Sequence, residues 1–156
     1  MNIHIRRATA ADAETLTEIA HAAKRHWGYP EHWITQWQSD LTITADFINQ
    51  NMVFVAEIDN QIAGCSALAI DGPLAEVEHM WVRPEYMGTG LGRRLLEQVT
   101  NEATARNLPE LELSADPNAA GFYRHMGAVQ IGEIPAEMDG HARVLPRMRI
   151  RLAERK

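Results

Sequence analysis

The sequence lacks the features that mark secreted and membrane proteins. Its 156 residues include one cysteine, so no disulfide can form within the chain. Cys65 stands in an apolar run, and we expect it to pack as a small buried hydrophobic residue with no catalytic role. No apolar run approaches the roughly 20 residues that span a bilayer, and no apolar signal segment opens the chain. These absences predict a cytoplasmic protein without a membrane segment.

Basic residues are not in excess either. The chain has 15 Lys and Arg against 21 Asp and Glu, a formal net charge of -6. Proteins that bind nucleic acid non-specifically concentrate Lys and Arg to neutralise phosphates, so we expect no nucleic-acid partner. His21, His26 and His32 lack the i, i+4 spacing and the Cys or carboxylate partners of a ligand set, so we expect no metal.

Repeats, low-complexity stretches and Pro/Gly/Ser-rich linkers are absent as well. The composition, 46% hydrophobic and 23% charged, is ordinary for a globular protein. A chain of this length can bury a substantial core without disulfides or metals. We therefore predict one domain over residues 1–156, with its core between about residues 3 and 152.

The most informative segment is a glycine-rich loop that ends in Met-Gly-Thr-Gly-Leu-Gly. It joins a strand-like run, Val77 to Val82, to an amphipathic helix that begins near Leu91. Glycines let the main chain approach a ligand closely, and a helix start leaves several N–H groups without partners. These amides and the helix dipole attract a pyrophosphate group. A plain strand-to-helix turn, with glycine used only for backbone freedom, is the alternative.

The spacing excludes the two commonest glycine-rich nucleotide sites. No Lys-Ser or Lys-Thr follows the last glycine, which argues against a P-loop. The order is G-x-G-x-G, not the G-x-G-x-x-G of a Rossmann dinucleotide site.

The hydrophobic pattern along the chain predicts an α/β or α+β sheet whose faces are covered by helices. In the last predicted strand, Arg147, Arg149 and Arg151 alternate with apolar residues and are expected to form a solvated face. The expected strands are Asn2–Arg7, Met52–Ile58, Ile62–Ile70, Ala75–Val82, Leu111–Ala115 and two on either side of Asp139-Gly140. The expected helices run from a cap at Thr9 to about His26, from Pro30 through Trp37, over Ala45–Gln50, from Leu91 to before Pro109, and over Asn118–Met126.

The glycine loop resembles the coenzyme A pyrophosphate loop of the GCN5-related N-acetyltransferases. That family's pattern is Gln or Arg, then x-x-G-x-G or x-x-G-x-A, and here it falls on Met87, Gly90 and Gly92. Met87 departs from the pattern, which removes one polar side chain but none of the amides, so we expect weaker cofactor binding and not its loss. A second stretch, residues 116–128, is similar to the family's other cofactor motif, with Asn118, a Phe-Tyr pair that ends at Tyr123, and a closing glycine.

The order of predicted elements also matches this family from about Ile3 to Leu152. The resemblance implies a single-domain acyl-CoA N-acyltransferase fold with a mixed, mostly antiparallel sheet flanked by helices. It implies transfer of an acetyl group from acetyl-CoA to a primary amine, with a small molecule as the favoured acceptor. A peptide or protein amine, and a non-catalytic acyl-CoA-binding or sensing module, are the alternatives. Many relatives dimerise, so a homodimer is compatible with the resemblance.

The resemblance also assigns the cofactor to particular residues. Strand backbone would pair with pantetheine, the loop would hold the pyrophosphate, and an amide and a phenol from the second motif would complete the site. The implied cofactor-binding residues are Met80, Trp81, Val82, Met87, Gly88, Thr89, Gly90, Leu91, Gly92, Arg93, Asn118 and Tyr123.

The reaction requires a base and an acid. A lysine-like amine has a pKa of about 10.4, so a base must remove its proton before attack. Glu78 is the first candidate, with Glu76 on the same face of the strand in support, although both could be ordinary solvent-facing residues. His79 belongs to the other face and would act only if a bulge re-aimed it. Tyr123 is the candidate acid for the thiolate, with packing as an amphipathic aromatic residue as its alternative role.

The acceptor is expected near the segment that follows the first helix, which is rich in aromatic residues. Trp27 and Tyr29 in the turn are candidate substrate-binding residues, together with Glu78 and His79. Trp33 and Trp37, four positions apart, are expected to form one buried helix face instead. For Asn118, capping the helix that follows is the alternative to binding the cofactor.

Overall fold

The computed structural model describes residues 2–152, which form helices around a seven-stranded sheet. The strand order is β1-β2-β3-β4-β5-β7-β6. The described residues form two compact units. The first comprises residues 2–69 and 78–99, and the second comprises residues 70–77 and 100–152.

The elements follow the predicted order. The first unit contains β1 (Ile3–Arg7), η1 (Ala10–Asp12), α1 (Ala13–His26), α2 (Glu31–Gln36), α3 (Gln38–Leu41), α4 (Ala45–Gln50), β2 (Met52–Ile58), most of β3 (Gln61–Asp71), the end of β4 (Leu74–Val82), η2 (Pro84–Tyr86) and the start of α5 (Leu91–Ala105). The second unit contains the rest of β4 and α5, then β5 (Glu110–Ser114), α6 (Ala120–His125), β6 (Val129–Met138) and β7 (His141–Arg151).

Helices cover both faces of the strands in the first unit. Leu16 and Ile19 of α1 pack with Val53 and Val55 of β2 on one face. On the other face, Leu95 and its neighbours on α5 pack against apolar residues of β2 and β3. Strands covered on both faces have nearly continuous apolar sequences, which explains why β2 and β3 lack a clear polar alternation.

The β2–β3 hairpin turns more tightly than the sequence predicted. Asp59 and Asn60 both have positive φ, 52° and 65°, and β3 begins at once with Gln61. Two residues with positive φ are the geometry of a type I′ turn, which matches the twist of antiparallel strands. Pairing then shifts between Ala56 and Glu57, because one additional residue, Ala63, is accommodated in β3.

Gly64 allows β4 to lie close to β3. A Cβ at this position would stand 2.7 Å from the Trp81 carbonyl oxygen and 3.0 Å from Leu95 Cδ1. Because the carbonyl belongs to the backbone, the strand would have to shift. We expect Gly64→Ala to lower the free energy of unfolding by about 1–3 kcal/mol. Urea denaturation measures this, and an unchanged midpoint for Gly64→Ala would contradict the close approach. Gly121→Ala, which meets no atom within 4 Å, serves as the control.

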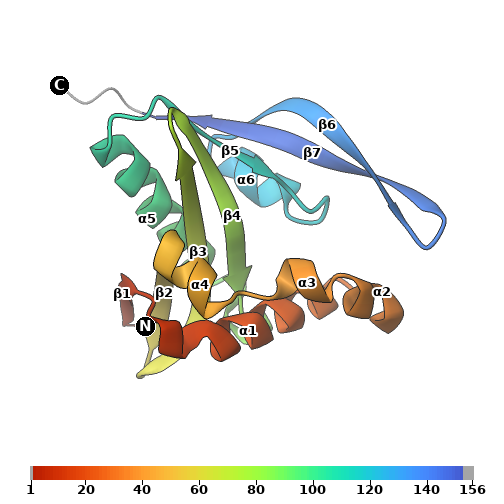
Figure 1. Ribbon diagram of the computed structural model, residues 1–156, viewed down its shortest axis with the longest axis horizontal. Coiled ribbons are helices and arrows are strands. Elements are labelled where there is room, and N and C mark those ends of the chain that lie inside the picture. The colour runs from red at the N-terminus through yellow and green to blue at the C-terminus, as the bar shows by residue number, and fades with distance from the viewer. Residues whose placement is uncertain (1, 153–156) are drawn as a thin grey trace. The chain divides into compact units, whose positions relative to one another are not determined.

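The second unit is built on β5 and a long hairpin. Glu76 of β4 pairs with Glu112 of β5 in parallel, whereas β7 runs antiparallel to both β5 and β6. The hairpin reverses at Asp139 and Gly140, with φ of 54° and 80°, as the sequence predicted. Figure 1 shows β6 and β7 as a twisted two-stranded ribbon.

The predicted fold class is therefore confirmed, with differences at several helix ends. Thr9 precedes the 3₁₀ turn η1, where the Asp12 carboxylate accepts the Thr9 backbone N–H at 2.8 Å, and α1 begins only at Ala13. The helix predicted from Pro30 breaks at Trp37 into α2 and α3. Among residues 2–152, none of the helices combines the length and apolarity needed to cross a bilayer.

Candidate active site

Strand β4 carries the predicted acidic residues Glu76 and Glu78 and leads towards the glycine loop. Within the first unit, Met80 and Val82 pack with the start of α5, whereas Trp81 packs with α1, α2 and α3. The end of the strand is fixed by Arg83, whose N–H donates to the Ala63 carbonyl at 2.8 Å. The Arg83 side chain donates a further hydrogen bond from Nε to the Ile62 carbonyl at 2.9 Å. The strand therefore enters the loop from a well-defined point.

The loop has the backbone geometry expected of an anion site. Gly88 and Gly90 have φ of 79° and 88°, in the region that favours glycine. The first hydrogen bond of α5 runs from Arg94 N–H to the Gly90 carbonyl at 3.2 Å, so the amides just before Arg94 precede the helical ladder. Those are the amides of Leu91, Gly92 and Arg93, at the positive end of a 15-residue helix. The predicted pyrophosphate-binding residues therefore form one continuous segment.

Side chains within the loop support its shape. The Thr89 hydroxyl donates to the Tyr86 carbonyl, which closes the turn after η2. Met87, which stands at the Gln or Arg position of the motif that the loop resembles, is half-buried, and its backbone N–H donates to the Pro84 carbonyl at 3.2 Å. Arg93 is exposed and pairs with Glu97 at 3.0 Å, one helical turn along. A single rearrangement of that exposed pair would make the Arg93 guanidinium available to a phosphate.

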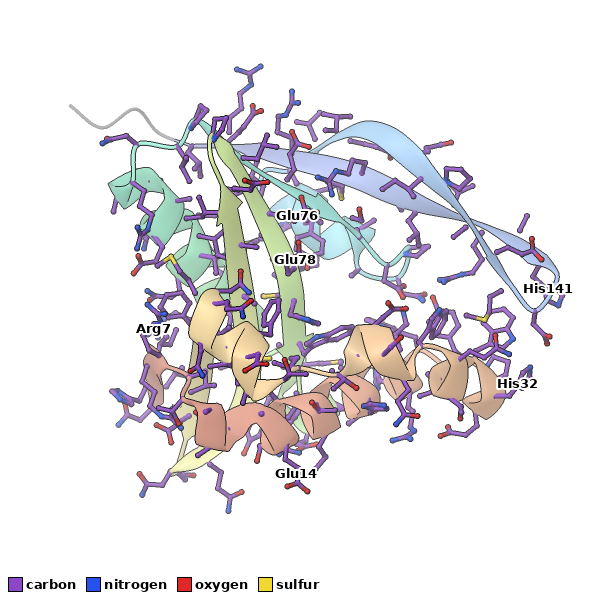
Figure 2. The ribbon with its side chains drawn as sticks, viewed as in Figure 1. Arg7, Glu14, His32, Glu76, Glu78 and His141 are labelled. Atoms are coloured by element: carbon purple, nitrogen blue, oxygen red, sulfur yellow. The ribbon has the colours of Figure 1, made fainter. Side chains whose placement is uncertain are left out.

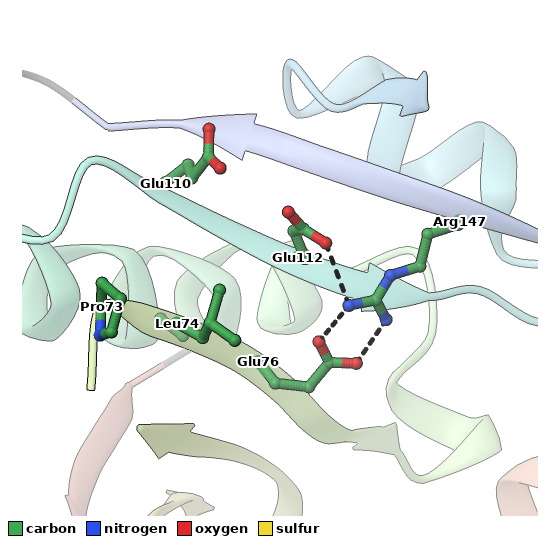
Figure 3. A pocket seen from close by; sticks show the side chains of 7 residues that line it. Pro73, Leu74, Glu76, Glu110, Glu112 and Arg147 are labelled. Atoms are coloured by element: carbon green, nitrogen blue, oxygen red, sulfur yellow. Dashed lines mark hydrogen bonds and ion pairs between the residues drawn. The ribbon is translucent and has the colours of Figure 1, made fainter. Parts of the chain in front are cut away.

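Glu76 lies in the second unit and is bound by an arginine. Both of its carboxylate oxygens accept hydrogen bonds from Arg147, in the two-pronged arrangement that suits a guanidinium (Figure 3). Arg147 also donates to Glu112 at 3.2 Å and to the Ser114 hydroxyl at 3.0 Å. These contacts compensate the charge of Glu76 and engage both of its oxygens.

The predicted solvated row of arginines is wrong for two of its three members. Only 23% of the Arg147 side chain and 32% of the Arg149 side chain are exposed. Arg149 pairs with Glu112 at 3.1 Å and Glu110 at 3.3 Å. Hydrogen bonds from Arg149 and then Arg147 hold the pKa of Glu112 below its usual value. The row faces acidic residues on neighbouring strands, which the sequence of one strand could not reveal.

Glu78 lies in the first unit, and its side chain is exposed. Figure 2 shows Glu76 and Glu78 on the same strand. The exposure of Glu78 keeps its carboxylate accessible to a ligand. Of the two predicted acidic residues, Glu78 is the more exposed.

His79 is half-buried on the face of β4 that α4 covers. The Trp81 indole Nε1–H donates to His79 Nδ1 at 3.0 Å, and the Phe47 ring meets the imidazole edge-on at 5.2 Å. Burial lowers the pKa of His79 to about 4. The imidazole is therefore neutral near pH 7, and its basic nitrogen is already occupied by a hydrogen-bond donor.

The lowered pKa of His79 predicts a loss of stability in acid. The unfolded chain binds this proton near pH 6.5, and the native protein binds it only near pH 4. The free energy of unfolding should therefore fall as pH drops from about 6.5 to 4, by at most about 1.4 kcal/mol per pH unit from this group. Urea denaturation at several pH values, compared with His79→Gln, measures the effect. An equally steep acid dependence in both proteins would contradict it.

Tyr123 and Asn118 belong to the second unit. Tyr123 is only 7% exposed, and burial, with a smaller contribution from the charge of Asp116, raises its phenol pKa. The phenol therefore stays protonated across the neutral pH range, as an acid must before it reacts. Asn118 does not cap α6, because the N-cap is Ala119, and its side chain donates to Asp116 at 3.0 Å. The capping alternative for Asn118 is wrong.

The aromatic segment after α1 forms a cluster around a lysine. Tyr29 stacks on Trp33 and meets Trp37 edge-on, with ring centroids 5.9 and 5.0 Å apart. Lys24 Nζ lies 4.3 Å from the Trp37 ring centroid and 5.0 Å from that of Tyr29. The expected buried face of Trp33 and Trp37 is wrong, because both are half-buried and Ile34 is the core residue of α2. Trp27, at the end of α1, is 37% exposed.

Three contact partners of the candidate residues were missed at the sequence level. Arg147 binds Glu76 across two strands, Phe47 contacts His79, and Lys24 approaches the aromatic rings. The alternating arginines of the last strand drew attention to Arg147. The residue that Arg147 binds depends on the order of strands in the sheet, which the sequence does not give. Phe47 and Lys24 carry no sequence signal that would connect them with β4 or with the turn.

Comparison with known proteins identifies the family. The model of the GNAT acetyltransferase domain matches residues 49–127, which include β4, the glycine loop and both Asn118 and Tyr123. The chain is 39% identical over 83 residues to an IAA acetyltransferase of Azospirillum brasilense, a match that covers 50% of this chain and 54% of that protein. The matches to curated relatives thus span about half of their length or less.

Solved structures share the fold over almost the whole chain. A GCN5-related N-acetyltransferase from Rhodopseudomonas palustris superposes with a TM-score of 0.83 at 22% identity, over 97% of each chain. The PaiA N-acetyltransferase of Thermoplasma acidophilum, solved with coenzyme A, gives 0.76 at 23% identity over 97% of this chain and 99% of that one. YncA of Salmonella typhimurium, described as a putative acetyltransferase with its cofactor acetyl-CoA, gives 0.72 at 24% identity over 100% and 97%.

The loop geometry, the order of elements and the family match agree. Acetyl-CoA is the cosubstrate of this family. The chain belongs to the GNAT family of acetyltransferases.

Proposed function

We propose that this protein transfers an acetyl group from acetyl-CoA to a primary amine, with a small molecule as the acceptor. The observation that supports it most is the loop from Met87 to Arg93, where two glycines with positive φ lead into the amides of α5. In this proposal the loop amides bind the pyrophosphate of the cofactor, and the backbone of β4 from Met80 to Val82 lies along the pantetheine. Asn118 is a further proposed cofactor-binding residue.

Glu78 is the proposed general base. The proposal rests on the states of its two neighbours, since Arg147 binds both oxygens of Glu76 and the Trp81 indole occupies the basic nitrogen of His79. The exposed Glu78 carboxylate would remove a proton from the ammonium form of the acceptor, directly or through water. The amine lone pair would then attack the thioester carbonyl carbon, and the tetrahedral intermediate would expel the coenzyme A thiolate. Glu76 supports the strand through its ion pair and is not proposed as a second base.

Tyr123 is the proposed acid that protonates the departing thiolate. We expect Tyr123→Phe to lower kcat by about 10²-fold, because the thiolate would leave without a proton donor. The affinity for acetyl-CoA should hardly change, since only one hydroxyl is removed. Steady-state kinetics and calorimetric titration of acetyl-CoA separate the two effects. Tyr86→Phe is the control, and an unchanged kcat in Tyr123→Phe would remove Tyr123 from this role.

The experiment that tests the function is thiol release from acetyl-CoA by the purified protein. The acceptors should include amino acids, polyamines, aminoglycosides and short peptides, each with a blank that lacks acceptor. Release that depends on one acceptor class supports the proposal and identifies the substrate. Tight binding of acetyl-CoA by calorimetry without release for any acceptor would favour a sensing module, and the absence of binding would refute the proposed site.

A further inference from the structure

The hydrogen bond between Trp81 and His79 determines where the imidazole carries its proton. An indole N–H can only donate, so His79 Nδ1 must accept and cannot be protonated in this arrangement. The single proton of the neutral ring therefore lies on Nε2. The Trp81 ring is itself held between α1, α2 and α3, where it packs near Ala20, Ile34 and Leu41.

The Nε2–H of His79 is a donor that the protein itself does not use. Across residues 2–152, the only hydrogen bond made by the His79 side chain is the one it accepts from Trp81. Nε2 is also not fully buried within the described part of the chain, so solvent can reach it. A half-buried donor of fixed orientation is suited to bind an oxygen atom of a ligand.

The surroundings of His79 connect it with the segment expected to bind the acceptor. Phe47 meets the imidazole edge-on at 5.2 Å, and the Trp81 ring centroid lies 6.3 Å away. Trp81 packs against the same apolar cluster as Tyr29 and Trp37. All of these residues belong to the first unit. Aromatic side chains therefore lie beside the His79 imidazole. One of them, Trp81, also packs with the aromatic segment after α1.

We propose that His79 is a specificity-determining residue whose Nε2–H donates a hydrogen bond to a carbonyl oxygen of the acceptor. The acceptor is then an amine that also carries an amide, ester or carboxylate group, and simple alkylamines and polyamines are poor substrates. This inference rests on the proposed acetyltransferase function for its substrate role. Its basis in the structure, the protonation of Nε2 and its availability to a ligand, does not depend on turnover.

The first test measures the tautomer of His79 by NMR. Long-range ¹H–¹⁵N correlation of uniformly labelled protein near pH 7 distinguishes a protonated nitrogen of the ring from an unprotonated one. We expect an unprotonated Nδ1 and a protonated Nε2 for His79, and a mixture of tautomers in Trp81→Phe, where the indole donor is lost. Protonation of Nδ1 in the unaltered protein would overturn the proposal.

The second test asks whether Nε2–H binds a carbonyl group. Glycinamide and 4-aminobutanamide are compared with ethylamine and butylamine, primary amines with the same number of carbon atoms that lack the carbonyl, in the presence of coenzyme A. We expect the amides, and not the alkylamines, to move the ¹⁵N resonance of His79 Nε2. No movement with either amide, or equal movement with the alkylamines, would overturn the proposal even in a protein that is fully active.

Kinetics with the same pairs measures the effect on specificity. Loss of one neutral hydrogen bond is worth about tenfold in affinity, so His79→Leu should raise KM for the preferred amide about tenfold with little change in kcat. His79→Gln, which keeps an N–H donor in a similar position, should restore most of the affinity. His32→Leu, an exposed histidine on α2, is the control.

The outcomes separate this inference from the proposed function. No acetyl transfer to any amine, with the expected tautomer and amide-dependent resonance shift, would refute the function alone. Alkylamines acetylated as efficiently as their amide partners, or a fall in kcat for all acceptors alike in His79→Leu, would refute the role of His79 in specificity alone.

Discussion

Glu78→Gln is expected to lower kcat by about 10³-fold while the Kd for acetyl-CoA stays unchanged. Glutamine keeps the size of the side chain but cannot take a proton from the acceptor ammonium. Since an amine with a pKa of about 10.4 is almost entirely protonated at pH 7, attack would then depend on the rare neutral form. Raising the pH increases that form, so the deficit of the variant should shrink towards pH 10.

The control for Glu78→Gln is Glu85→Gln, which removes the charge of another exposed glutamate in the same unit. It should leave kcat unchanged. Glu76→Gln should instead lower stability, because it leaves Arg147 without its two-pronged partner. A deficit in Glu78→Gln that is the same at every pH, or a larger deficit of kcat in Glu76→Gln, would contradict the choice of Glu78 as base.

Gly90→Glu is expected to weaken acetyl-CoA binding by at least about 100-fold, which corresponds to about 2.7 kcal/mol. Gly90 has φ of 88°, a conformation that costs other residues about 1–3 kcal/mol. The added carboxylate would also stand at the amides proposed to bind a pyrophosphate and would repel it. A Cβ at position 90 meets no atom within 4 Å, so the substitution should cause no steric clash. Its effect should be confined to the loop conformation and to ligand binding.

Gly140→Glu is a matched control for Gly90→Glu. Gly140 has φ of 80° in the β6–β7 turn, and a Cβ there also meets no atom within 4 Å. Both variants therefore introduce the same strain and the same charge. Calorimetric titration should find normal acetyl-CoA affinity in Gly140→Glu and affinity at least about 100-fold weaker in Gly90→Glu. Normal affinity in both would show that the loop does not hold the pyrophosphate.

The sequence predicted the elements well because their signals are local. The two-residue turns at Asp59-Asn60 and Asp139-Gly140, and the helix that starts after Gly90, depend on residues within a few positions of one another. The family resemblance predicted the glycine loop for the same reason, because one continuous segment forms the loop. The helix boundaries that differ, at Ala13 and Ala120, depend on hydrogen bonds at the helix ends.

The partners of the catalytic candidates could not be predicted, because they come from distant segments. Arg147 binds Glu76 from 71 positions away, and this depends on β7 lying beside β5. The sequence places His79 and Trp81 on one face of a strand, but not whether the indole would reach the imidazole. The sequence could therefore identify Glu76 and His79 as candidate bases. It could not show that Arg147 binds Glu76 or that the Trp81 indole donates a hydrogen bond to His79.

The most direct test of the central claim compares two amounts in one reaction. The protein is incubated with acetyl-CoA labelled in the acetyl group and the best acceptor, and free thiol and labelled N-acetyl product are both quantified. We predict equal amounts of thiol and amide, neither of which forms without the acceptor. Thiol that forms without acceptor, or that exceeds the amide, would contradict an N-acetyltransferase and indicate thioester hydrolysis instead.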